Sequence, residues 1–417
     1  MARIHEHAAT SHFDDDMIRD WLRLARTPHV GPITFYRLLQ KFGTARAALD
    51  ALPDLVPAHG KQKKLTPAPL ADIDHELNAL HKMGCMILCA DDVRYPAPLR
   101  AVEDAPPVIT VLGNIELLKR RCVGIVGARN ASMNGRNFAR KLATDLSATG
   151  IGVVSGLARG IDTAAHEGSL SGGTIAVVAG GVDIVYPPEN QKLYDSIRAE
   201  GLIVAESPLA QEPFAQSFPR RNRVISGLSQ GIVVVEASLR SGSLITARVA
   251  AEQGRDVFAV PGHPMDPRAE GTNSLIRDGA VMVRSAQDIL DDLRTLQPDE
   301  FHTAAGVIPG GLFDRATGFF HDDKTKHDDD VFADLDDDIL DMMLDLGVRP
   351  IPTSPASNPA DLCEAILDHL STTAVDIDDL IRTLGHSTAT VQSALLTLEL
   401  AGRVQRLPGN RVVRLAA

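Results

Sequence analysis

The chain has 417 residues and a net charge of −12; with 44% hydrophobic and 23% charged residues, it has the composition of a soluble globular protein of about two to four domains. No apolar run approaches the roughly 18 residues of a membrane span, and the N-terminal residues lack the apolar stretch of a signal peptide, so we expect a cytoplasmic protein without membrane contact. The four cysteines have spacings typical of neither a zinc site nor a redox motif, so we expect reduced thiols and no metal site.

Residues 1–85 predict a helical N-terminal domain. The segment 29–43 reads HVGPITFYRLLQKFG, and its apolar residues at helical spacing on both sides of a Gly31–Pro32 turn resemble a helix-hairpin-helix. That motif binds phosphates through backbone N–H groups, but Pro32 lacks this donor and suits the first position of the second helix. A packing role is therefore favoured over phosphate binding.

Residues 86–300 predict an α/β domain with a Rossmann-like, doubly wound parallel sheet. Apolar runs alternate with helical patterns, and strands that are apolar on both faces are typical of a parallel sheet covered on both sides. The predicted strands are CVGIVG, IGVVSG, GTIAVVAGG, GLIVAES, GIVVVEAS and DVFAVPG. Ligands of such a sheet bind at the carboxyl ends of the strands, where turns and helix N-termini meet.

Two turns at these ends contain candidate anion-binding residues. Arg129 follows the first strand directly, and its guanidinium suits bidentate contact with a phosphate. The second strand is followed by SGLARGIDTAAH, which combines two glycines, an arginine and capping residues before a helix whose N-terminus attracts anions. A tight turn capped by Asp162 without any ligand is the alternative. The candidates in this second turn are Ser155, Gly156, Arg159, Gly160 and Asp162.

Two later segments add to this set. FPRRNRVISGLS places three arginines at a predicted helix start, where cations oppose the helix dipole by roughly 0.3 to 1 kcal/mol each, so an anion is expected nearby. The alternative is pairing with carboxylates such as Glu206 or Glu236. SLRSGSLITA forms another anion-ready helix N-terminus. The candidates are Arg220, Arg221, Asn222, Arg223, Ser241, Gly242, Ser243 and Thr246.

The common nucleotide-cofactor motifs are missing from the sequence. There is no G-x-x-x-x-G-K-[ST], GIVGARNASMNG lacks the G-x-G-x-x-G register, and the second strand ends without a ribose-binding acid. His166 lacks an obvious nucleophile or paired acid, which favours a packed histidine over a general base. We therefore expect no cofactor and no catalytic residues; several helix N-termini with clustered arginines suit a polyanion better than a single diphosphate.

Residues 301–360 contain 12 acidic and 4 basic residues, and so carry most of the net negative charge. Acidic blocks and spaced prolines predict a flexible linker, with a transient helix near Asp338–Leu346. A solvated spacer is favoured, and mimicry of DNA that competes for a basic groove is the alternative.

Residues 361–417 predict a winged-helix-like domain, with three amphipathic helices followed by two short strands around Pro408–Asn410. The helix Thr388–Leu400, which takes the position of a recognition helix, contains no Lys or Arg, whereas readers of the major groove normally carry several. Protein contact or domain packing is favoured over duplex binding. The arginines lie in the wing, at Arg403, Arg406, Arg411 and Arg414.

These motifs together resemble the DprA/Smf family of bacterial DNA-processing proteins. The resemblance covers about 200 continuous residues, through blocks such as VGIVGARNAS, VVSGLARGIDTAAH, FPRRNRVISGLS, VVEASLRSGSLITARVAAEQGR and GTNSLIRDGA. It implies a non-enzymatic, homodimeric Rossmann-like protein that binds single-stranded DNA, protects strands in natural transformation or recombination, and helps load the RecA recombinase. It also implies that the candidate residues above contact DNA. The acidic linker looks like an insertion specific to this lineage.

Two other functions stay open at this point. A Rossmann-like enzyme that processes nucleoside monophosphates would use the same phosphate-ready loops, and would need a carboxylate such as Asp162 or Glu236 at the site. An adaptor would use the winged helix and the dimer surface to contact a recombinase.

Overall fold

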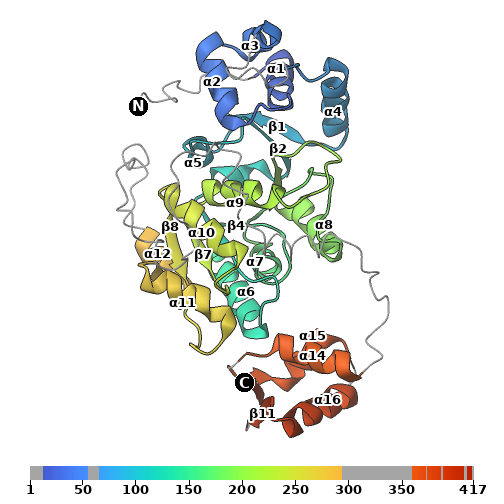
Figure 1. Cartoon of the computed structure of the whole chain (residues 1–417), viewed down its shortest axis with the longest axis vertical. Helices are drawn as coiled ribbons and strands as arrows, with labels where there is room; N and C mark the ends of the chain where they lie inside the picture. Colours follow the sequence, from blue (N-terminus) through green and yellow to red (C-terminus); the bar gives the residue numbers. More distant parts are fainter. Residues whose placement is uncertain are drawn as a thin grey trace. The chain divides into compact units, whose positions relative to one another are not determined.

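The computed structural model describes residues 13–54, 65–293, 359–371, 373–386, 388–407 and 411–415 (Figure 1). The predicted helix near Asp338 and the turn at Pro408–Asn410 lie outside the described residues, as does almost all of the predicted linker. The described chain forms two compact units. Unit 1 comprises residues 1–124, 150–157 and 170–230, and unit 2 comprises residues 125–149, 158–169 and 231–417.

The α/β part of the chain contains a nine-stranded sheet with the strand order β1-β2-β6-β5-β4-β3-β7-β8-β9. The strands are β1 (Met86–Cys89), β2 (Val108–Gly113), β3 (Cys122–Val126), β4 (Gly152–Ser155), β5 (Thr174–Val178), β6 (Leu202–Ala205), β7 (Gly231–Val234), β8 (Asp256–Ala259) and β9 (Val281–Met282).

The six predicted strands, β3 to β8, are confirmed, and the sheet is mostly parallel. Parallel pairing joins β3 to β4, β4 to β5, β5 to β6, β7 to β8 and β8 to β9. Every residue of β3 and β5 is buried, as expected for strands covered on both faces. The structure adds an antiparallel extension that the sequence did not predict, in which β1 pairs with β2 and β2 pairs with β6.

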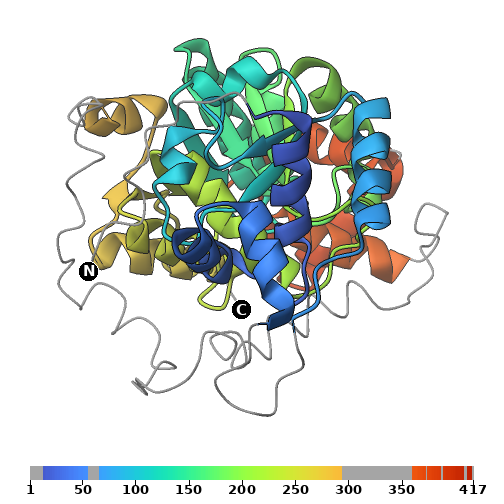
Figure 2. The same ribbon diagram turned by 90° about the horizontal axis from the view of Figure 1, so that it is seen from above.

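Unit 1 begins with the predicted helical domain, whose helices α1 to α4 lie together in Figures 1 and 2. Pro32 is the first residue of α2, as predicted, and Phe35 and Tyr36 of the same helix are buried. The Tyr36 hydroxyl donates a hydrogen bond to the Ala105 carbonyl at 3.1 Å, so α2 packs on residues before β2. The helices of unit 1 are α1 (Asp15–Ala25), α2 (Pro32–Phe42), α3 (Ala45–Ala51), α4 (Leu70–Lys82), α5 (Ala97–Arg100), α8 (Gln191–Glu200) and α9 (Ser217–Leu228).

Unit 2 contains two tightly packed helices, α6 and α7. Gly168 permits their close approach, because a Cβ added there would overlap the backbone of Arg140. The Thr144 hydroxyl donates to the Gly168 carbonyl at 2.8 Å, and Arg140 pairs with Glu167 at 2.5 Å. The helices of this α/β part of unit 2 are α6 (Met133–Ala148), α7 (Ile161–Ser169), α10 (Gly242–Glu252), α11 (Glu270–Arg277), α12 (Ala286–Leu293) and the short 3-10 helix η4 (Pro267–Ala269).

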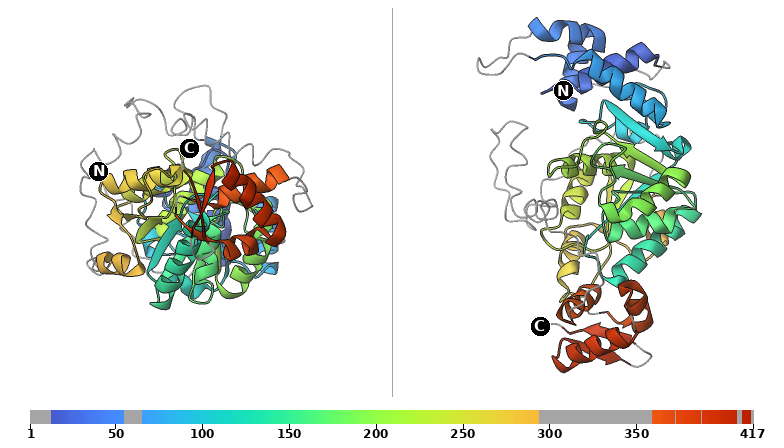
Figure 3. Two further views of the ribbon diagram at one scale, coloured as in Figure 1. Left: turned by 90° about the horizontal axis from the view of Figure 1, so that it is seen from below. Right: turned by 90° about the vertical axis from the view of Figure 1, so that its right-hand side faces the viewer.

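The end of unit 2 is the predicted winged-helix domain, whose red helices and strands lie together in both views of Figure 3. Apolar residues of its helices form one core, represented by Ile366, Leu380 and Leu395, and Met133 from α6 joins the same cluster. The elements are α14 (Pro359–His369), β10 (Val375–Asp376), α15 (Ile377–Leu384), α16 (Thr388–Leu400), β11 (Val404–Leu407) and β12 (Arg411–Arg414), with the sheet order β10-β12-β11.

Candidate functional site

The loop between β3 and α6 carries Arg129 and is attached at both ends to one residue. The Ala128 N–H donates to the backbone carbonyl of Glu236 at 2.7 Å, and the Ser132 N–H and hydroxyl donate to the Glu236 carboxylate at 2.8 and 2.6 Å. Ser132 also caps α6, because its hydroxyl accepts the Gly135 N–H at 2.9 Å. Between these anchors, the Arg129 side chain is half-buried.

The loop before α7 packs against this Arg129 loop. Gly160 has a φ of +75°, and an added Cβ would overlap the carbonyl oxygens of Ala128 and Arg129. The Ile161 N–H donates to the Ala128 carbonyl at 3.3 Å. Unit 2 thereby brings Arg129 close to the loop of Arg159, whose side chain is exposed. Gly160 is required here because of its positive φ and because the backbone of Ala128 and Arg129 leaves no room for a Cβ.

Asp162 differs from its predicted capping position. Helix α7 already begins at Ile161, two residues before the start that an Asp162 N-cap would give. The buried Asp162 carboxylate accepts the Ala158 N–H at 3.4 Å from within the first turn. The side chain therefore reaches back to its own loop. His166, on the same helix, is fully buried, as the packing interpretation predicted.

The arginines of FPRRNR differ in their surroundings within unit 1. Arg220 is exposed and Asn222 is half-buried, whereas Arg221 and Arg223 are buried. The Arg221 guanidinium donates to the carbonyls of Gly156 and Val177, the latter at 3.2 Å. Arg221 therefore links the ends of β4 and β5, next to the buried Ser155 and Gly156.

Arg223 forms the carboxylate pairing that was the alternative to anion binding. Its guanidinium lies 2.5 Å from Glu206 and 3.4 Å from the Asp104 carboxylate, and it also donates to the Asp104 carbonyl. Glu236, the other carboxylate named as a possible partner, instead accepts hydrogen bonds from Ser132 in the Arg129 loop. Contact of Arg221 and Arg223 with DNA stays a prediction, while their observed contacts are internal.

The N-terminus of α10 is capped by a serine, and its contact with an anion stays a prediction. Ser241 is its N-cap and accepts the Ser243 N–H at 3.4 Å, and the two hydroxyls lie 2.7 Å apart. Gly242 is exposed, with open space where a Cβ would be. The Thr246 side chain is buried and donates to the Gly242 carbonyl at 3.4 Å. The residues that an anion would meet at this helix end are therefore Ser241, Gly242 and Ser243.

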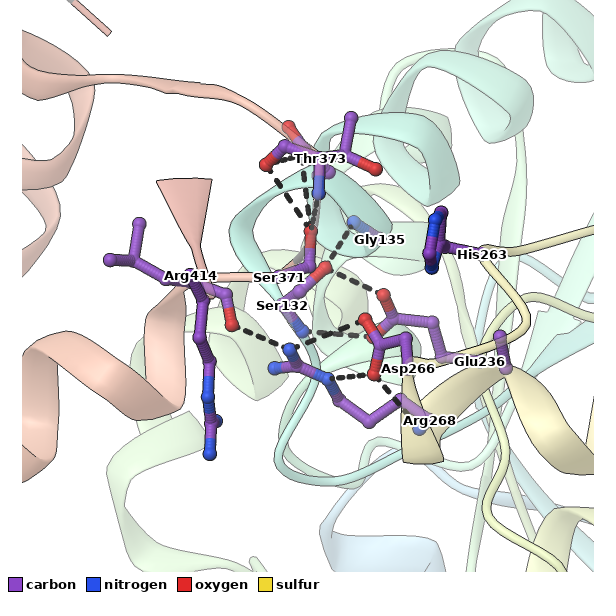
Figure 4. A network of polar contacts seen from close by, with 12 residues as sticks. Ser132, Gly135, Glu236, His263, Asp266, Arg268, Ser371, Thr373 and Arg414 are labelled. Carbon is purple, nitrogen blue, oxygen red and sulfur yellow. Dashed lines mark hydrogen bonds and ion pairs between the residues drawn. The ribbon is translucent and has the colours of Figure 1, made fainter. Parts of the chain in front are cut away.

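A buried carboxylate lies at the N-terminus of α6. Burial raises the pKa of the Glu236 carboxyl above its ordinary value, while the hydrogen bonds from Ser132 act in the opposite direction. A Cβ added to Gly135 would lie 2.5 Å from the Glu236 Cδ, so this glycine lets the carboxylate approach the first helical turn (Figure 4). The protein thus places its own anion where a helix N-terminus would otherwise bind a ligand. Sequence reasoning missed this role, although an acid at the carboxyl end of β7 was a signal.

Two features are absent from the described residues. No helix in the described ranges is long and apolar enough to cross a membrane. The described His, Cys, Asp and Glu side chains form no grouping that could hold a metal ion.

Family comparisons cover most of the chain. Residues 86–294 match the family described as DNA recombination-mediator protein A. Residues 15–79 match the DprA-like N-terminal HHH domain, and residues 350–410 match the DprA winged helix domain. The helix-hairpin-helix resemblance and the winged-helix prediction are thereby confirmed.

Individual relatives agree with these matches. The Protein Smf of Synechocystis is 32% identical and aligns with 94% of this chain and 98% of its own length. The DNA processing protein DprA of Streptococcus pneumoniae is 44% identical over 47% of this chain and 70% of its own. The X-ray structure of DprA from Streptococcus pneumoniae has 40% identity and a TM-score of 0.51, covering 54% of this chain and 78% of that one.

Proposed function

Because this chain belongs to the DNA recombination-mediator protein A family, also called DprA/Smf, we propose that it binds single-stranded DNA through the arginines of its α/β domain. The observation that carries the proposal is the pair of touching loops in unit 2, which present the half-buried Arg129 and the exposed Arg159. Guanidinium groups bind phosphates strongly and without sequence preference. The exposed Arg220 of unit 1 and the Ser241-capped end of α10 are further proposed phosphate contacts.

The proposed activity is binding without chemical turnover. A nucleotide-processing enzyme would need a carboxylate able to act on a substrate. Asp162 instead accepts the Ala158 N–H of its own loop, and Glu236 accepts the Ser132 N–H of the Arg129 loop. These contacts support a structural role for both acids, and therefore favour the binding function over the enzyme.

The proposal extends to partners. Protection of single strands and delivery of RecA onto them, in natural transformation or chromosomal recombination, follow from the family resemblance. So do a homodimer and a cytoplasmic location. The winged helix suits protein contact, because α16 has no Lys or Arg and exposes Leu396 and Leu400. RecA filament assembly on single strands, measured with and without this protein, tests the delivery role.

The binding experiment is a titration with single strand, duplex and mononucleotides at two salt concentrations. We expect preference for single strand, and a log–log salt slope of roughly −0.7 per neutralised phosphate. Arg129→Ala should weaken single-strand binding about tenfold, as loss of a charged hydrogen bond does. Arg284→Ala is the matched control, since Arg284 is exposed and pairs with Asp288. An affinity that does not change with salt concentration, or equal affinities of Arg129→Ala and Arg284→Ala, would contradict the proposal.

A further inference from the structure

Glu236 contacts the Arg129 loop through both its backbone and its side chain. Its carbonyl oxygen accepts the N–H of Ala128, the residue just before the arginine, and its carboxylate accepts both donors of Ser132, three residues after the arginine. A single residue at the end of β7 therefore fixes the two ends of a five-residue loop. These contacts are made with residues that flank Arg129, so their effect on its guanidinium passes through the loop backbone.

The surroundings of the carboxylate make this attachment rigid. Gly135 admits the carboxylate to within van der Waals contact of the first turn of α6, and the Ser132 hydroxyl is shared between the carboxylate and the Gly135 N–H. Ser132 itself is fully buried. A buried carboxylate with fixed hydrogen-bond donors holds its partners more firmly than an exposed one, because water does not compete for them.

The opposite side of the loop is held by the start of α7. Gly160 touches the carbonyls of Ala128 and Arg129, and the Ile161 N–H donates to Ala128. The backbone of Arg129 is therefore held by Glu236 on one side and by the start of α7 on the other, and of these only Glu236 contributes a carboxylate. Replacing the carboxylate by an amide would leave one of the two Ser132 donors, the N–H or the hydroxyl, without its acceptor.

We propose that Glu236 is a positioning residue for single-strand binding, which holds the loop so that Arg129 meets a phosphate. This inference rests on the proposed function. Glu236 is not expected to touch the DNA, whose phosphates would repel its carboxylate.

The test is a double-mutant cycle of Glu236→Gln and Arg129→Ala in the full chain, with single-strand affinity and its salt slope as readouts. Glu236→Gln keeps the side-chain size and replaces one acceptor oxygen by an amide donor that faces the Ser132 donors. We expect it to weaken binding about tenfold and to reduce the salt slope by roughly 0.7, the loss of one phosphate contact. In the Arg129→Ala background, the same change should have no further effect.

The matched control is Glu252→Gln, because Glu252 is an exposed acid of unit 2 that pairs with Arg248 on the surface. It should leave affinity and slope unchanged. General destabilisation lowers the fraction of active protein without changing the salt slope, so the slope separates positioning from loss of fold. If Glu236→Gln does not fold, Ser132→Ala takes its place in the cycle, since it removes the 2.6 Å bond to the carboxylate.

The outcomes distinguish this inference from the proposed function. An Arg129→Ala variant with wild-type affinity would overturn the role of Arg129, and the positioning role with it. If Arg129→Ala weakens binding but Glu236→Gln leaves affinity or slope unchanged, only the positioning role is wrong. Additive losses of affinity in the double variant would also overturn the positioning role, because they would show that Glu236 and Arg129 act independently.

Discussion

Arg268 donates a hydrogen bond to the carbonyl oxygen of Leu370 at 2.5 Å, and so joins the α/β part of unit 2 to its winged-helix domain. The same guanidinium donates to the Asp368 carbonyl at 3.0 Å and is held by the Asp266 carboxylate at 3.2 Å. The Asn134 amide adds a bond to the Thr373 carbonyl at 3.2 Å. A cation at the C-terminus of α14 satisfies carbonyls that the helix leaves unpaired and interacts favourably with its dipole.

We therefore expect Arg268→Ala to weaken the attachment of the winged-helix domain to the α/β part of unit 2. Loss of hydrogen bonds from a charged donor weakens an interaction by about 1.5 to 3 kcal/mol, so amide exchange near Leu370 and Ser371 should become at least about tenfold faster. Hydrogen–deuterium exchange of the full chain measures this, with Arg284→Ala as control. Unchanged exchange at these amides would show that the contact contributes nothing to holding the domain.

The contact between Arg268 and the end of α14 should also weaken in acid, because of His369, the last residue of α14. Burial lowers the pKa of His369, and the nearby positive charges of Arg136 and Arg268 lower it further, whereas its contact with the Ala365 carbonyl and the charge of Asp368 act in the opposite direction. A histidine whose pKa is lowered in the docked state stabilises that state while neutral, at pH values above its ordinary value of about 6.5. The stabilisation is lost as pH falls through and below that value.

Exchange at Leu370 and Ser371, corrected for intrinsic rates, should therefore be slower at about pH 7.5 than at about pH 5.5. His369→Gln keeps a polar side chain but cannot titrate, so it should remove most of this difference. If exchange in the His369→Gln variant depends on pH as strongly as in the wild type, another group causes the pH dependence.

The strands of the α/β domain could be predicted from sequence because β3 to β8 are apolar on both faces and alternate with helical patterns. The antiparallel pair β1 and β2 was missed. Met86–Cys89 has only four residues, and its identity as a strand depends on pairing with Val108–Gly113, which lies beyond α5 in the chain. Pairing at such a distance leaves no local periodicity to read.

The candidate residues do lie near strand ends, but their surroundings could not be predicted. The cluster FPRRNR contains three arginines, and only the helix rotation and distant partners determine which is exposed. Arg221 meets Gly156 and Arg223 meets Glu206, and neither partner is close in sequence. The sequence allows Glu236 to pair with the arginines or to act as an acid of an enzyme. The fold instead brings the end of β7 beside α6, where the Glu236 carboxylate binds Ser132 of the Arg129 loop.

Gly160→Ala should disturb the Arg129 loop. At a φ of +75° an alanine is strained, and its Cβ would overlap the Ala128 and Arg129 carbonyls. We expect a loss of about 2 kcal/mol or more in unfolding free energy, together with weaker single-strand binding. Gly150→Ala is an informative control, because Gly150 has a φ of +87° with open space around it, so only the backbone cost applies. Equal destabilisation by the two variants would contradict the close approach of the loops.

Arg223→Met should destabilise the fold. The substitution leaves Glu206 and Asp104 without their shared cation, and breaking a buried ion pair on one side costs about 3 to 5 kcal/mol. The lower end of this range is expected, because the two carboxylates are 26% and 44% exposed and keep part of their hydration. Chemical denaturation gives the free energy of unfolding directly, and a change below about 1 kcal/mol would show that the pair is not a stabilising one.

Arg220 lies three residues earlier on the same helix, and Arg220→Ala should affect DNA binding and not stability. Arg220 is exposed, so its removal is expected to change the unfolding free energy by less than about 0.5 kcal/mol. If it contacts a phosphate, single-strand affinity should fall and the salt slope should decrease by roughly 0.7. Titrations at several salt concentrations, combined with denaturation of the same preparation, measure both quantities. A variant that binds normally would remove Arg220 from the proposed DNA contacts, whereas a variant that unfolds easily would mean that this arginine, like Arg223, has a structural role.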